Sequence, residues 1–161
     1  MISRAMPSSR PARLAARLGQ VRSASDVLLL GQIAVLAALV PALMRLPLPR
    51  LARLLALADR GPRPRPDAAR ERHVLALVSL VLDLGRPALR PTCLTWGLTR
   101  YVALRQAGAE VDLLFGLGQG PDQQFGGHCW LVRDGQPLLE TQDPRLWFAE
   151  IFRLPTAPRR W

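Results

Sequence analysis

Two residues of this 161-residue chain, Cys93 and His128, could together carry out nucleophilic chemistry. Thr92 is a good N-cap residue, so Cys93 is predicted to stand in the first turn of a helix. There, unpaired backbone N–H groups and the helix dipole favour a thiolate. His128 begins a strand-like run, and Glu140 supplies a carboxylate further along the chain. A thiol, an imidazole and a carboxylate are the groups of a Cys–His–acid triad for acyl transfer.

The loop between two predicted strands decides whether Glu140 can reach His128. The strands lie on either side of Asp134-Gly135. A two-residue loop would pair His128 with Thr141 and turn Glu140 to the wrong face. A loop one residue longer would pair His128 directly with Glu140, so that the carboxylate can orient the imidazole. We therefore expect the three-residue loop.

Two other acids could hold the imidazole in place of Glu140. Asp134 is more typical of a turn, and Asp143, which precedes a proline, is more typical of a helix cap. Both remain alternatives for the third member of the triad. Taken singly, Cys93 could also be a small buried hydrophobic residue and His128 a satisfied core histidine.

The residues around the thiol and the imidazole are predicted to bind substrate or to fill the core. Gly97 lies one turn beyond Cys93 on the same helix face, where the missing side chain leaves room for a substrate or another backbone. Trp130 shares a strand face with His128, and we expect both Gly97 and Trp130 to contact substrate. Cys129 lies on the opposite strand face. It is therefore predicted to point away from Cys93, as a buried core thiol without a disulfide.

The basic charge of the chain is concentrated before Cys93. The sequence has no lysine, and residues 1–92 hold 15 arginines against 5 acids, whereas residues 93–161 hold 7 of each. Such an asymmetry suggests an acidic peptide, a membrane surface or nucleic acid as a partner. Few aromatic residues stand among the arginines and no nucleic-acid-binding motif is present, so nucleic acid is not expected.

The cysteine count bears on cofactors and on the cell compartment. Two cysteines cannot make a disulfide framework, and their spacing fits no zinc site. We expect no metal and no cofactor, and a reducing compartment, the cytoplasm.

An apolar run from Val27 to Met44 contains 18 residues without a charge. That length is at the lower edge of what spans a membrane. Gln32, Gly31 and Pro41 weaken a membrane span, so a buried helix of a helical subdomain is favoured. Contact with a membrane surface is the main alternative.

Caps and breakers predict an α+β fold, with an α-helical half before a small α+β unit. Asp67 and Thr92 are expected to begin helices, and Gly85 and Gly108 to follow their ends, Gly85 in a left-handed conformation. A proline-rich linker ends a basic and apolar segment, residues 1–66, and the catalytic unit occupies residues 67–161. The predicted helices are residues 25–41 (with Ser25 as N-cap), 49–58, 67–84, 92–107 and 144–152, and the predicted strands are 111–117, 127–133 and 136–141.

Three segments together resemble a known family. They are Arg90-Pro-Thr-Cys93-Leu94, Tyr101-Val-Ala-Leu-Arg105-Gln-Ala-Gly108 and Phe125-Gly-Gly-His128-Cys-Trp130-Leu-Val-Arg-Asp-Gly135. In this order and spacing they are similar to the lasso-peptide maturation proteases, the B2-type proteins of the transglutaminase-like superfamily. The similarity covers roughly residues 67–155.

This resemblance implies a papain-like fold and a bacterial cysteine peptidase that removes the leader from a ribosomally made precursor peptide. It implies Cys93 as nucleophile and His128 as base. The implied partners are the precursor, a separate leader-recognition protein and the macrocycle-forming cyclase. The family usually has Asp where this chain offers Glu140, Ser at Gly97, Ala at Cys129 and Glu at Arg133.

Two other functions fit the same residues. The triad could pass the acyl group to an amine, as an acyltransferase does. Alternatively, the chain could be a non-catalytic, membrane-associated assembly factor, because a fold does not fix a function.

Overall fold

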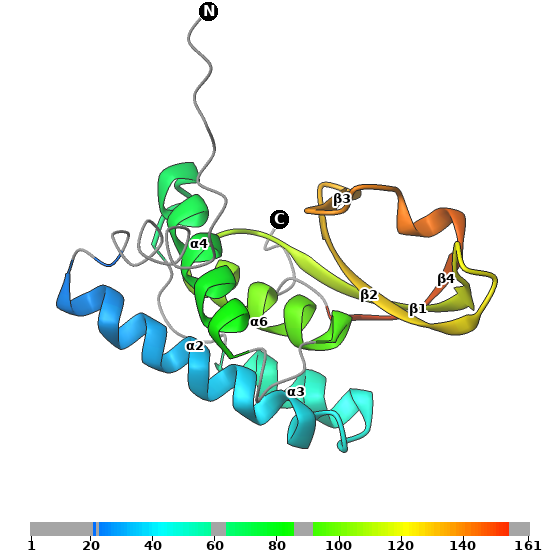
Figure 1. Ribbon diagram of the computed structural model, residues 1–161, viewed down its shortest axis with the longest axis horizontal. Helices are drawn as coiled ribbons and strands as arrows, with labels where there is room; N and C mark the ends of the chain where they lie inside the picture. The colour runs from blue at the N-terminus through cyan, green and yellow to red at the C-terminus, as the bar shows by residue number, and fades with distance from the viewer. Residues whose placement is uncertain (1–20, 22, 59–63, 86–91, 155–161) are drawn as a thin grey trace, which may run out of the picture.

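The computed structural model describes residues 21, 23–58, 64–85 and 92–154. Within them, the helices gather on one side of the molecule and an antiparallel sheet extends to the other (Figure 1). This arrangement is an α+β fold. The helices are α2 (Ala24–Leu43), α3 (Leu48–Ala58), α4 (Ala68–Leu84) and α6 (Cys93–Gln106), and the remaining elements are β1 (Asp112–Gln119), β2 (Phe125–Arg133), β3 (Gln136–Leu138), the 3₁₀ turn η1 (Pro144–Leu146) and β4 (Phe148–Leu154).

Side-chain caps set the helix starts. Asp67 accepts a hydrogen bond from the backbone N–H of Ala69, and Thr92 accepts one from Thr95, as their residue types predict. The N-cap of α2 is Ser23, not the predicted Ser25, because Ser23 and Asp26 form a reciprocal capping box.

The two helix-ending glycines differ. Gly108 has a φ of +93°, and a Cβ there would collide with the carbonyl oxygen of Pro64. Gly85 has a φ of −74°, so the predicted left-handed conformation at this position is wrong. It caps α4 in an ordinary right-handed conformation, with its N–H bonded to the carbonyl of Val81.

The sheet has the strand order β3-β2-β1-β4. The helix predicted at residues 144–152 is wrong: only Pro144–Leu146 forms a 3₁₀ turn, and the chain then continues as β4 along β1. Asp143 caps that turn, as predicted for its place before Pro144. The predicted strand at 136–141 is also shorter than expected, because β3 ends at Leu138.

One core joins α6 to the sheet and to α2. Leu98 and Leu104 of α6 are fully buried against Leu113 and Leu131 of the sheet, and Val40 of α2 belongs to the same cluster. Residues on both sides of the predicted boundary at residue 66 therefore share this core. A second cluster packs α2, α4 and α6 together.

Helix α2 is buried along one narrow face only. Ile33, Ala37 and Val40, spaced four and three residues apart, are its buried residues. Val35 and Leu28 are 61% and 66% exposed. In the described part of the chain α2 is the one helix long and apolar enough to cross a membrane, and only 17% of its apolar window is buried. The helix that was predicted to be buried therefore forms, but most of its surface is exposed.

Candidate active site

Cys93 is the first residue of α6, directly after the N-cap Thr92. Helix α6 packs on β2, and the half-buried thiol lies 4.0 Å from the carbonyl oxygen of Gly127. The predicted position in the first helical turn is confirmed. Backbone N–H groups of that turn have no partner inside the helix, and they favour a negative charge on the sulfur.

His128 lies in β2 opposite Gly116 of β1. Its ring centroid is 6.0 Å from that of Trp130, with the planes only 14° apart, and 5.3 Å from that of Phe148. A Cβ at Gly116 would lie 2.8 Å from the Trp130 indole and 2.9 Å from Phe148. Glycine at position 116 therefore allows the two aromatic side chains to close around the imidazole and to restrict its orientation.

Glu140 meets His128, but not by the predicted register. Arg133 pairs with Gln136, so the loop has two residues, and the expected three-residue loop is wrong. Its positive φ angles, 49° at Asp134 and 77° at Gly135, are those of a type I′ turn, which Asp-Gly favours.

The ladder ends at the pair Leu131–Leu138, two residues before Glu140. Leu139 then adopts a φ of +65°, which redirects the chain. Glu140 Oε2 thereby comes to lie 3.6 Å from His128 Nε2, with both side chains 26% exposed. Because Nε2 faces Glu140, Nδ1 is the ring nitrogen left to exchange a proton with the thiol.

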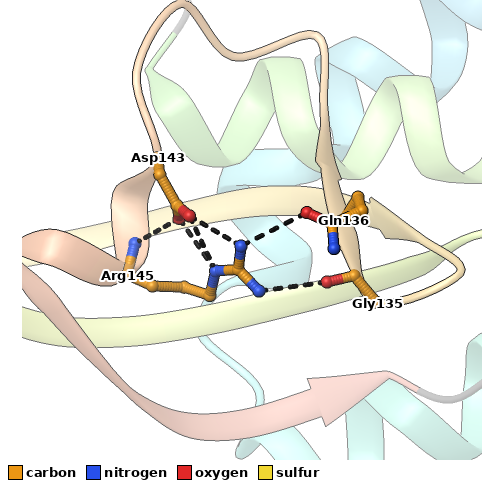
Figure 2. A network of polar contacts seen from close by, with 4 residues as sticks. All are labelled: Gly135, Gln136, Asp143 and Arg145. Atoms are coloured by element: carbon orange, nitrogen blue, oxygen red, sulfur yellow. Dashed lines mark hydrogen bonds and ion pairs between the residues drawn. The ribbon is translucent and has the colours of Figure 1, made fainter.

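The side chain of Arg145 holds the segment that carries Glu140 in place. Its guanidinium makes two-pronged contacts with Asp143, the shortest being 2.6 Å, and donates to the Gly135 carbonyl at 3.1 Å and to Gln136 Oε1 at 3.4 Å (Figure 2). These contacts tie the chain just after Glu140 back to the start of β3. Asp143, a predicted alternative partner of the imidazole, is bound to Arg145, and Asp134 lies in the turn.

The thiol and the imidazole strongly perturb each other's ionisation. The pKa of Cys93 falls to about 4, chiefly through a hydrogen bond from the Cys129 thiol and then through one from His128, while partial burial opposes the change. The pKa of His128 rises to about 9, first because the Cys93 sulfur and then because Glu140 accepts a hydrogen bond from the imidazolium, while partial burial opposes the change. At neutral pH the pair is therefore a thiolate and an imidazolium, the reactive state of a cysteine nucleophile.

Cys129 lies closer to the thiol than predicted. It is on the strand face opposite His128, as expected, but that face packs on α6, and Cys129 Sγ lies 3.1 Å from the carbonyl oxygen of Cys93. The prediction that Cys129 points away from Cys93 is therefore wrong. Its single S–H proton can go to this carbonyl or to the Cys93 thiolate, and the thiolate raises the pKa of Cys129 well above its usual range. Both cysteines are free thiols, and Cys129 is buried.

Gly97 makes room for Cys129. A Cβ at position 97 would lie 2.7 Å from Cys129 Sγ and 3.2 Å from Leu113. The space that was expected to admit a substrate or a backbone is thus taken by the second thiol. Gly97 and the buried Trp130 still border a small cavity beside Cys93. Their contact with substrate stays a prediction.

Two cavities meet at His128 and Glu140. The smaller, about 170 Å³, also reaches Cys93 and Arg100, whereas the larger, about 500 Å³, is not lined by Cys93. Arg100 lies over the Trp96 ring, with its Cζ 4.5 Å from the ring centroid, and burial lowers its pKa while the Glu140 charge opposes that change. Its Nε is buried and has no hydrogen-bond partner within the described structure.

The structure thus brings Cys93, His128 and Glu140 together. It adds groups that the sequence reasoning missed, among them Cys129 as a hydrogen-bond donor and Arg100 beside the thiol. Arg100 follows Cys93 by seven residues on the helix, two turns along the same face, so its spacing could have indicated it.

Comparison with known proteins agrees with this arrangement. Residues 36–153, more than two thirds of the chain, match the model of the transglutaminase-like superfamily. The chain belongs to this superfamily. No curated protein and no solved structure matches it significantly. Members of the superfamily are usually cysteine-dependent enzymes, and the site is of that kind.

Proposed function

We propose that the chain is a cysteine peptidase that removes the leader from a ribosomally made, lasso-type precursor peptide. The observation that carries the enzymatic part is the thiolate–imidazolium pair of Cys93 and His128, with Glu140 beside it, in a transglutaminase-like chain. The motif resemblance around Cys93 and His128 supports the substrate.

The chemistry follows from the positions of the groups. The Cys93 thiolate attacks the scissile carbonyl, and a C–S bond forms as the C–N bond breaks. The His128 imidazolium gives its proton to the leaving amine. Its neutral ring then takes a proton from the attacking water, as a C–O bond forms, the C–S bond breaks and the Cys93 thiolate is released. Glu140 orients the ring and stabilises the imidazolium.

The direct test is to incubate the purified chain with the precursor peptide and its leader-recognition protein and to weigh the products. Cleavage at one bond by the native chain is expected, with none by the Cys93→Ala variant at unchanged thermal stability. An amide formed with an added amine would favour the acyltransferase alternative. Cleavage by Cys93→Ala at the native rate would overturn the nucleophile assignment.

We further propose that the uncovered face of α2 docks the leader-recognition protein, and that the chain acts in the cytoplasm on this partner's bound precursor. Val27, Leu28, Val35 and Leu39 are 50–66% exposed there. A contact through this face buries apolar area, so binding should resist salt, whereas docking through the arginines of residues 1–66 should weaken as salt rises.

Val35→Ser is the matched variant for this surface, because the side chain is 61% exposed and lies outside the buried face of α2. Loss of partner binding by Val35→Ser supports the docking surface. Unchanged partner binding, with loss of binding to lipid vesicles, would instead favour the membrane alternative.

A further inference from the structure

The smaller cavity contains a charged group that the triad does not use. Cys93 borders this cavity, and so does the guanidinium-bearing residue Arg100. Arg100 follows Cys93 by two turns on the same face of α6, and side chains on a helix lean toward its N-terminus. The guanidinium lies over the ring of Trp96, one turn from Cys93, with Cζ 4.5 Å from the ring centroid. The positive charge of Arg100 is therefore carried toward the end of the helix that holds the thiol.

This guanidinium lacks a hydrogen-bond partner for one of its donors. Arg100 is half-buried, and its Nε is buried without a partner in the described part of the chain. Removal from water lowers the pKa of Arg100. Charged groups inside proteins are normally paired and hydrogen-bonded, because otherwise they lose their hydration without a replacement. A ligand that brings a negatively charged acceptor to Arg100 would supply the missing partner.

The other charged groups that line this cavity already have partners. Glu140 Oε2 lies 3.6 Å from His128 Nε2, and the His128 imidazolium is also hydrogen-bonded to the Cys93 thiolate. The charge of Glu140 favours the protonated form of Arg100, but its carboxylate is in contact with the imidazolium. The remaining lining residues described are neutral. An anion that enters the cavity would therefore meet Arg100 as the available cation.

We propose that Arg100 binds a carboxylate of the substrate in the cavity beside the thiol, so that the site selects a peptide with an acidic residue near the bond that breaks. This assignment rests on the proposed peptidase function and deepens it. Because that function cleaves within a longer precursor, the carboxylate is that of an aspartate or glutamate side chain and not a chain end. A guanidinium binds a carboxylate through two parallel N–H bonds, and stacking on Trp96 restricts the plane of this fork.

The test uses the full chain and two thiol reagents that differ in charge but hardly in size. They are 2-carboxyethyl methanethiosulfonate and its neutral amide, 2-carbamoylethyl methanethiosulfonate. The Cys93 thiolate attacks the sulfenyl sulfur of either reagent: a new S–S bond forms, the S–S bond of the thiosulfonate breaks and methanesulfinate leaves. Mass spectrometry of the peptide that contains Cys93 gives the rate constants at pH 7. The preference is the ratio of the carboxylate rate to the amide rate, divided by the same ratio for N-acetylcysteinamide.

We expect the native chain to prefer the carboxylate reagent by about tenfold, as one hydrogen-bonded ion pair allows. Arg100→Gln should remove this preference while the neutral amide still reacts at close to the native rate, which also verifies the fold. Arg100→Lys should keep only part of the preference, because an ammonium cannot make the two-pronged contact.

Arg72→Gln is the matched control for the change in charge. Arg72 is an exposed arginine of α4 that does not line the cavity, and its Nε donates to the carbonyl oxygen of Ala68. This variant should keep the full preference. A preference that falls equally in Arg72→Gln and Arg100→Gln would reflect net charge alone and would overturn the carboxylate site.

The other outcomes separate this site from the function on which it rests. A native chain without the preference, or a preference that Arg100→Gln retains, would overturn the role of Arg100 and leave the peptidase function standing. Equal slowing of both reagents by Arg100→Gln would also overturn it, because Arg100 would then act on the thiolate or on Glu140 and not on a ligand. A Cys93 no more reactive toward the neutral amide at pH 5 than N-acetylcysteinamide would instead contradict the thiolate, and with it the peptidase function.

Discussion

Replacing Cys129 by alanine should change the pH range of the enzyme rather than its rate at neutral pH. The Cys129 thiol is the main hydrogen-bond donor that lowers the pKa of Cys93 to about 4. His128 remains in the variant and continues to stabilise the thiolate. The variant therefore loses only part of the stabilisation of the thiolate, namely one hydrogen bond to the charged sulfur.

The magnitude follows from the strength of that bond. A hydrogen bond to a charged group contributes roughly 1.5–3 kcal/mol, and about 1.4 kcal/mol corresponds to one pH unit. The midpoint of thiolate formation should move upward by about one to two pH units. At pH 5 the thiolate fraction would fall from about nine-tenths to between about one-tenth and one-half, while at pH 7 it would stay near or above nine-tenths.

Alkylation by iodoacetamide between pH 3 and 8, followed by mass spectrometry of Cys93, measures this midpoint directly. Cys129→Ser is the control, because its hydroxyl can still donate to the sulfur and should keep the midpoint near that of the native chain. An unshifted midpoint in Cys129→Ala would refute the role of this donor. Equal shifts in Ala and Ser variants would show that packing against Gly97, and not the hydrogen bond, is what matters.

Three further outcomes are expected. The activity of the native chain should be constant between the pKa of Cys93, about 4, and that of His128, about 9. Below this range the thiolate is protonated, and above it the imidazolium loses its proton. A pH–rate profile with a maximum confined to pH 6–7 would contradict the ion pair. Glu140→Gln should lower kcat by about 10²-fold with little change in KM and move the alkaline limit to lower pH, and an unchanged alkaline limit would rule out Glu140 as the partner of His128. Arg145→Ala should lower kcat and also move the alkaline limit to lower pH. Arg153→Ala is the control, because the partners of Arg153, Asp112 and Glu150, lie outside the Glu140 segment. It should change neither kcat nor the alkaline limit in the same assays.

Local chemistry predicted the helices well and the last strand not at all. Asp67 and Thr92 each begin a helix because a side-chain acceptor next to free N–H groups works the same way in any fold. Residues 148–154 form β4, and only two of them, Phe148 and Phe152, are part-buried, with Leu154 fully buried. Such an edge strand shows no regular alternation, and its stability comes from pairing with β1, which the local sequence does not reveal.

The site was predictable where one element carries the information and not where several elements meet. The place of Cys93 depends on its helix cap alone, and it was found. The direction of Cys129 depends on which face of β2 packs on α6, and strand alternation does not contain that information. Arg145 reaches Gly135 and Gln136 across the hairpin, and nothing near Arg145 in the sequence indicates such a contact.

The position of Glu140 shows how a wrong register can still lead to the right pair of residues. With the two-residue loop, a regular strand would have placed Glu140 on the face away from His128. Leu139 prevents this by adopting a φ of +65°, a conformation that costs a non-glycine residue on the order of 1 kcal/mol or more. The Arg145 contacts and the Glu140–His128 ion pair lie on either side of this residue and can offset that cost together. The carboxylate is thus held by a break in the strand rather than by the strand itself, and a leucine gives no sequence signal for such a break.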